Sequence, residues 1–205
     1  SNTNNTLKGK ISTNTIIGLG LLTAIVVVMQ FISMGLRSGT FSITLTLIPI
    51  VVGSALYGWG SGAWLGFVFG VTVLLTGDAN PFLAVNIPGT IITVILKGAL
   101  AGAAAGLAYK LISKKNQIVA VIVSAVVAPV VNTGIFVLGS YVFFFDYISE
   151  LADGTNLFVF ILVGFVGINF IIELGINLVL NPAILQIIRI GKKYFGGKNQ
   201  IIKKQ

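Results

Sequence analysis

The chain has 205 residues, of which 56% are hydrophobic and 9% are charged, and its mean hydropathy is +1.02. A soluble domain would carry about a quarter charged residues, so this composition excludes a water-soluble protein and predicts an integral membrane protein. The sequence contains no cysteine and no histidine, which excludes disulfides, thiol chemistry and histidine-ligated metal sites.

The net charge of +8 does not indicate nucleic-acid binding, because eleven of the thirteen basic residues lie near the chain ends and around one turn at 110–115. Basic residues placed in this way set the orientation of a membrane protein. We therefore divide the chain into a polar cytoplasmic N-terminus (1–14), a membrane domain (15–190) and a basic cytoplasmic tail (191–205). The length allows about six spans of 20–25 residues.

The first apolar run extends from about Thr15 to Met34 and predicts a membrane-spanning helix. The residues before it are polar, so a cleavable signal peptide is not expected. Gly20 and Ala24 lie four residues apart on this helix and would let a second helix approach closely. That second helix belongs either to the same bundle or to a partner subunit.

A polar break containing Arg37 comes next, and two further helices are predicted over Ile43–Gly58 and Gly60–Thr76. The connection between them is so short that they must be antiparallel neighbours. Pro49 would kink the first of these helices or follow an unwound start. Glycines at every fourth position give the helix predicted over Gly60–Thr76 a smooth packing face: Gly62, Gly66 and Gly70.

Residues 77–89 predict an extended non-helical insert, because turn-forming residues alternate with apolar ones. We interpret the stretch from Asp78 to Asn86 as a lid that folds over a cavity, with both of these residues as candidates for substrate contact. The alternative is a connector without a binding role.

The fourth predicted helix, Thr90–Ile112, contains the densest face of small residues in the chain. Lys97 lies about a third of the way along it, too deep to reach the membrane surface easily. Its ammonium group therefore needs a partner. The candidates are Glu173, in a structural pair, and an anionic ligand. The small residues four apart on this helix are Gly98, Gly102 and Gly106.

The fifth predicted helix, Ile118–Phe145, has Pro129, Asn132 and Thr133 near its middle. A proline inside a helix frees a backbone carbonyl, and Asn132 places an amide beside it. An acidic connection leads to the sixth helix and contains Asp146, Glu150 and Asp153.

The sixth predicted helix begins at Leu157 and continues to about Ile190. Asn169, Glu173 and Asn177 recur at every fourth position and so share one face, with Asn181 one turn further on. A carboxylate in mid-membrane usually faces a bundle interior or a wet cavity. The stripe is therefore either a structural polar contact or one wall of a binding site.

Together these segments predict an all-α bundle of six transmembrane helices with both termini cytoplasmic. No phosphate-binding GxxxxGK[ST] motif is present, so this chain has no P-loop for ATP hydrolysis. An enzyme is not expected, and neither is a cofactor. We expect Asn132, Asn169 and Glu173 to face one cavity covered by residues 78–86.

Two motifs resemble a known family. The segment Ser42–Leu75 contains an L-x-x-I-P-x-x-x-G pattern and then a G-x-G-x-G turn into the third helix. The length, the six spans and the PVVNTG run are also similar to the substrate-binding S components of energy-coupling factor (ECF) vitamin transporters. The residues of the first motif are Leu45, Ile48, Pro49 and Gly53, and those of the second are Gly58, Gly60 and Gly62.

The resemblance implies a mechanism. S components capture a water-soluble vitamin from outside and release it inward when docked on a transmembrane coupling protein that is driven by two ATPase subunits. Small residues on the first helix contact that coupling protein, which would be Gly20 and Ala24 here. The alternative from another class is a secondary carrier or channel that works alone.

The second and third helices look most like the pantothenate branch of the family, with pyridoxine, riboflavin and folate also possible. Arg37 or Lys97 could bind a carboxylate, and Asn132, Asn169 and Glu173 could bind amide and hydroxyl groups. Glu173 would repel an anion unless Lys97 neutralises it, and a neutral or cationic vitamin such as pyridoxine would use that carboxylate more directly.

Overall fold

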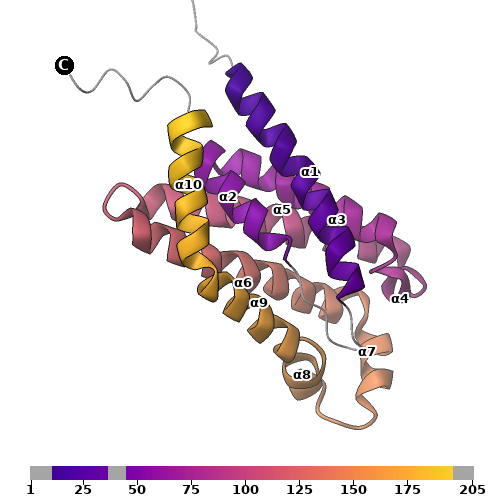
Figure 1. Ribbon diagram of the computed structural model, residues 1–205. Coiled ribbons are helices and arrows are strands. Elements are labelled where there is room, and N and C mark those ends of the chain that lie inside the picture. The colour runs from indigo at the N-terminus through magenta and orange to yellow at the C-terminus, as the bar shows by residue number, and fades with distance from the viewer. Residues whose placement is uncertain (1–10, 37–44, 196–205) are drawn as a thin grey trace, which may run out of the picture.

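The computed structural model describes residues 11–36 and 45–195, and the regular structure in these residues is entirely helical (Figure 1). The predicted all-α membrane bundle is therefore confirmed. Its elements are α1 (Thr13–Gly35), α2 (Leu47–Tyr57), α3 (Trp59–Thr76), α4 (Asn80–Leu83), α5 (Ile87–Ile112), α6 (Gln117–Phe143), α7 (Phe145–Ala152), α8 (Leu157–Val159), the π-helix η1 (Phe160–Phe165), α9 (Gly167–Val179) and α10 (Asn181–Phe195).

Five helical segments in the described residues are long and apolar enough to cross a membrane: α1, α3, α5, α6 and the combined segment Leu157–Val179. In the described part of the second predicted span, the helix α2 has 11 residues. At 1.5 Å per residue, α2 is about 16 Å long, roughly half the thickness of the hydrocarbon core. It is nevertheless almost entirely buried, because the longer helices surround it.

The start of α2 decides between the two roles predicted for Pro49, a kink within the helix or a position after an unwound start. Pro49 lies in the first turn of α2, where a missing N–H costs no internal hydrogen bond, so it follows a non-helical start and produces no kink. At the other end, Gly58 has a φ of 96°, which side-chain-bearing residues rarely adopt. This glycine makes the tight turn into α3.

One prediction about a connecting segment is wrong. Residues 77–89 are not extended, since they contain α4 and the first turn of α5. Asn86 starts α5: its side chain accepts a hydrogen bond from the Gly89 N–H at 2.9 Å. The acidic connection after α6 also forms a helix, α7, which is amphipathic and packs its buried residues Ile148 and Ala152 against the bundle.

The prediction of the sixth span as one continuous helix is also wrong. It is divided into α8, η1, α9 and α10, and α9 ends at Val179. Pro182 follows shortly after, and its missing N–H and its ring are incompatible with an uninterrupted helix. Figure 1 shows α10 running in a different direction from α9.

The glycine faces of α3 and α5 pack directly against each other. A Cβ at Gly102 would overlap the carbonyl oxygen of Gly62, and one at Gly66 would overlap that of Gly98. Backbone therefore contacts backbone at these positions. The two small-residue faces seen in the sequence form one helix–helix interface.

The helices α6 and α9 are joined through a proline. Pro129 has no N–H for the carbonyl of Ala125, four residues earlier in α6. Asn177 of α9 supplies the donor, with its Nδ2 atom 3.0 Å from the Ala125 carbonyl oxygen. This bond fixes the polar face of α9 against the middle of α6.

Candidate binding site

The polar stripe of α9 faces the bundle interior. Glu173 is 7% exposed and Asn177 is 1% exposed, although the helix is apolar on its other sides. Asn132 lies on the neighbouring helix α6 and is 6% exposed. These three side chains form the polar core of an otherwise apolar bundle.

Lys97 adds a cation to this region from α5. Its Nζ lies 5.2 Å from the centre of the Phe69 ring, within range for a cation–π interaction. The ammonium group is also attracted electrostatically to Glu173 and to Asp78. The fold thus brings together three charged residues that are 19 to 95 positions apart in the sequence.

Several buried polar atoms of the bundle have no hydrogen-bond partner among the residues that the structure describes. They come from α5, α6, α9 and α10, and they are Thr93 Oγ1, Asn132 Oδ1, Asn177 Oδ1 and Asn181 Nδ2. An unsatisfied buried polar group costs about 1–3 kcal/mol. Such a set therefore indicates a region whose partners come from a bound molecule or water.

Gln30 is a site residue that the sequence analysis missed. It lies in α1, is 2% exposed, and donates a hydrogen bond from Nε2 to Asp78 Oδ2. Its Oε1 accepts a hydrogen bond from Thr46 Oγ1 at 3.5 Å. The available signal was a lone amide within an apolar helix, because such a group needs partners in a membrane.

The other predicted site residues have less central positions. Asn169 is half-buried on α9, one turn before Glu173. Asn86 is half-buried, and its side-chain oxygen is engaged in starting α5. Arg37 lies outside the described residues.

The segment from Asp78 to Asn86 is anchored by an aromatic side chain. The Phe82 ring lies 5.4 Å from the Phe136 ring, 5.0 Å from the Phe144 ring and 5.9 Å from the Tyr147 ring, each in an edge-on arrangement. Offset and edge-on aromatic pairs are favourable beyond their buried area. The segment is therefore packed onto α6 and α7.

The chain matches a known protein family over most of its length. The profile of the family described as "ECF transporter, substrate-specific component" matches residues 14–185. The chain belongs to this family. It is a family of transport components and not of enzymes.

A solved structure has the same fold. ThiT from Listeria monocytogenes superimposes with a TM-score of 0.63 and 19% sequence identity. The match covers 88% of this chain and 96% of that one. No curated protein matches the chain significantly. At this identity the structural likeness establishes the fold alone and not the ligand.

The positions expected to contact a coupling protein are accessible in this S component. Gly20 and Ala24 are exposed on α1, and a Cβ added at Gly20 would meet no atom within 4 Å. Gly20 therefore takes no part in packing within the described bundle, and Ala24 is accessible beside it.

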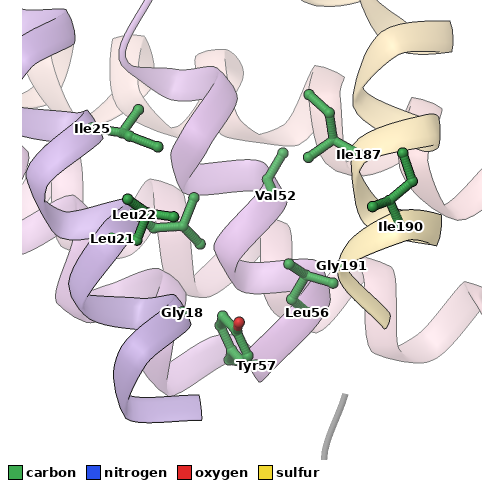
Figure 2. Close-up of a pocket in the computed structure, with 10 residues that line it drawn as sticks. All are labelled: Gly18, Leu21, Leu22, Ile25, Val52, Leu56, Tyr57, Ile187, Ile190 and Gly191. Carbon is green, nitrogen blue, oxygen red and sulfur yellow. The ribbon is translucent and has the colours of Figure 1, made fainter. Parts of the chain in front are cut away.

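A cavity of about 240 Å³ lies elsewhere, between α1, α2 and α10 (Figure 2). Its walls are apolar, with contributions from Leu22 and Ile25 of α1, Leu56 of α2 and Ile187 of α10. We call it the α1–α10 groove. None of the candidate site residues lines it, so it is separate from the polar core.

Proposed function

We propose that the chain is the substrate-capture subunit of an ECF-type importer and binds a water-soluble vitamin at the polar core between α5, α6 and α9. The observation that carries this proposal is the set of buried polar atoms that lack a partner in the described part of the chain, in the same bundle interior as the buried Glu173. A small hydroxylated or amide-bearing molecule has the donors and acceptors that such a set requires.

Pantothenate is the favoured substrate, from the resemblance of the second and third helices to that branch. Lys97 would bind its carboxylate and Asn132 one of its amide or hydroxyl groups. The charge balance of the site favours a second candidate. Among the described residues, Asp78 and Glu173 face the single cation Lys97, and this excess of negative charge suits a neutral or cationic vitamin such as pyridoxine.

The protein is proposed to lie in the cytoplasmic membrane with both termini inside. The turn between α5 and α6, with Lys114 and Lys115, lies at the opposite end of the bundle from α4 and α7 (Figure 1). The basic end would face the cytoplasm and the end with Asp146 and Glu150 would face outward. The exposed face around Gly20 and Ala24 would dock on the transmembrane coupling protein, which works with two ATPase subunits.

The test separates capture from transport. The purified chain should bind the radiolabelled vitamin in detergent, yet liposomes that contain it alone should accumulate none. Adding the coupling protein, the two ATPase subunits and ATP should produce uptake. Uptake by the chain alone, driven by a proton or sodium gradient, would instead establish the alternative of a secondary carrier.

A further inference from the structure

Two glycines determine the shape of the α1–α10 groove. Gly18 is buried beside Tyr57 of α2, and a Cβ there would overlap the tyrosine hydroxyl. Gly191 is buried in α10, and a Cβ there would lie 2.7 Å from the Leu56 side chain. These glycines draw α1 and α10 close to the end of α2. Figure 2 shows the aliphatic side chains of α1 and α10 on opposite sides of the space.

The lining of the groove suits a hydrocarbon chain. Tyr57 contributes the one polar side chain among the lining residues, and its hydroxyl lies at one end of the space in Figure 2. The cavity holds about 240 Å³ and is open on one side. A water-filled space with such walls would be unfavourable, because apolar side chains offer water no hydrogen bonds.

Basic residues stand at the same end of the molecule as the groove. Lys193 is exposed and lies two residues after the lining residue Gly191, with its Nζ 5.3 Å from the centre of the Tyr194 ring. Lys192 is directed elsewhere, since its Nζ donates to the Tyr109 hydroxyl at 2.6 Å. No acidic residue occurs in α1, α2 or α10. The end of α10 that lines the groove therefore carries lysines, and none of the three helices that form the groove carries an acidic residue.

We propose that the α1–α10 groove binds one acyl chain of an anionic phospholipid, whose phosphate is held near Lys193. Apolar walls and nearby lysines match the two parts of such a lipid, since juxtamembrane basic residues attract anionic headgroups. This site is distinct from the expected docking face. On α1 the groove is lined by Gly18, Leu22 and Ile25, whereas Gly20 and Ala24 point to another side of the helix.

The experiment measures lipid retention by native mass spectrometry of the full chain, released from nanodiscs that contain equal amounts of dioleoyl phosphatidylglycerol and dioleoyl phosphatidylcholine. The unmodified chain should retain one phosphatidylglycerol. Lys193→Gln should lower the preference for phosphatidylglycerol about fivefold, as expected for one lysine near an anionic surface. Ile187→Trp should fill the groove and abolish retention of either lipid.

Val28→Trp is the matched control, because Val28 is exposed on α1 and does not line the groove. It should retain lipid as the unmodified chain does. If Ile187→Trp fails to fold, Leu21→Trp fills the groove from the opposite wall. Equal retention of both lipids by the unmodified chain would overturn the proposal. Retention by a folded, groove-filled variant would also overturn it, and loss of coupling-protein binding in that variant would show that the groove is a protein-docking surface.

Discussion

Lys97 and Glu173 are charges that a membrane protein retains only when the fold compensates them. A charged side chain at mid-membrane costs about 2.5–3.5 kcal/mol on insertion scales, and removing one member of a buried pair leaves the other uncompensated. Here Lys97 is attracted to two carboxylates, of Glu173 and Asp78. The arrangement leaves one negative charge in excess, and this excess can discriminate between substrates.

Glu173→Gln tests that discrimination directly. The substitution removes the carboxylate charge with little change in shape. If the substrate is pantothenate, its affinity should rise, because repulsion of its carboxylate is relieved. If the substrate is pyridoxine or a cation, affinity should fall about 5–150-fold. Isothermal titration with each vitamin separates the two candidates, and an unchanged affinity for every bound vitamin would remove Glu173 from the site.

Asn132→Ala tests whether the polar core binds the substrate at all. Its Oδ1 has no hydrogen-bond partner in the described part of the chain, so we expect it to accept a hydrogen bond from the ligand. Losing that bond should weaken binding by about 1–3 kcal/mol. Ser124→Ala is the matched control on the same helix, because Ser124 is buried and donates to the Ala105 carbonyl at 3.0 Å. Equal affinity in both variants would refute the assignment.

Gln30→Met tests the amide that was missed from the sequence. Methionine has a similar length but cannot donate to Asp78 or accept from Thr46. We expect a loss of about 1–3 kcal/mol in the free energy of unfolding, because a buried hydrogen bond to a charged group is removed. Chemical denaturation in detergent provides the measurement, with Val28→Met, at an exposed position on the same helix, as the control. A stability equal to that of the control would contradict the role of Gln30.

At the scale of helices, one hydrogen bond joins α6 to α9. The carbonyl of Ala125 is freed by Pro129 and accepts from Asn177. Pro129→Ala would restore the internal donor and make the bond from Asn177 redundant. In a double-mutant cycle with Asn177→Ala, we expect a coupling energy of about 1 kcal/mol between these positions. Additive effects on the free energy of unfolding would show that the two helices are not coupled through this carbonyl.

The glycine interface of α3 and α5 gives a second prediction at this scale. Gly102→Ala places a Cβ against the Gly62 backbone, and overpacking of this kind costs about 1–3 kcal/mol or prevents folding. Gly20→Ala is the matched control, because nothing lies within 4 Å of the added Cβ. The melting temperature should fall for Gly102→Ala and not for Gly20→Ala. A similar decrease in both would contradict the close packing.

The sequence predicted the apolar helices well, because long hydrophobic runs and helical glycine spacing are local signals. The prediction from sequence failed where one residue type is compatible with both a turn and a helix start, or where a proline interrupts an apolar run. Residues 77–89 contain turn-forming residues that instead begin two helices, with Asn86 and Pro88 at the start of α5. Pro182 was overlooked within a strongly apolar run, and it accounts for the break before α10.

The candidate site could be predicted only in part. The stripe of Glu173 and Asn177 follows from helical periodicity, which is a local property. The contact between Gln30 and Asp78 joins residues 48 positions apart, and their approach depends on how the helices pack. The same holds for the α1–α10 groove, which depends on the position of α10 after its break.

At the scale of the whole molecule, the bundle separates its polar groups by depth. Six of the described basic residues lie toward the ends of α5 and α10 and in the turn after α5, and one basic residue, Lys97, lies inside beside the carboxylates. This separation gives the chain one end suited to anionic headgroups, a polar core suited to a small ligand, and an exposed α1 face. A capture subunit needs these three surfaces.

The most direct test of the central proposal is a thermal-shift screen of the detergent-purified chain against the B vitamins. A ligand at 100 times its Kd adds about 2.7 kcal/mol to stability, which raises the Tm of a chain of this size by about 5–10 °C. We predict that one vitamin alone, with pantothenate favoured, produces this shift. A folded chain whose Tm is unchanged by every vitamin would contradict the assignment as a vitamin-capture subunit.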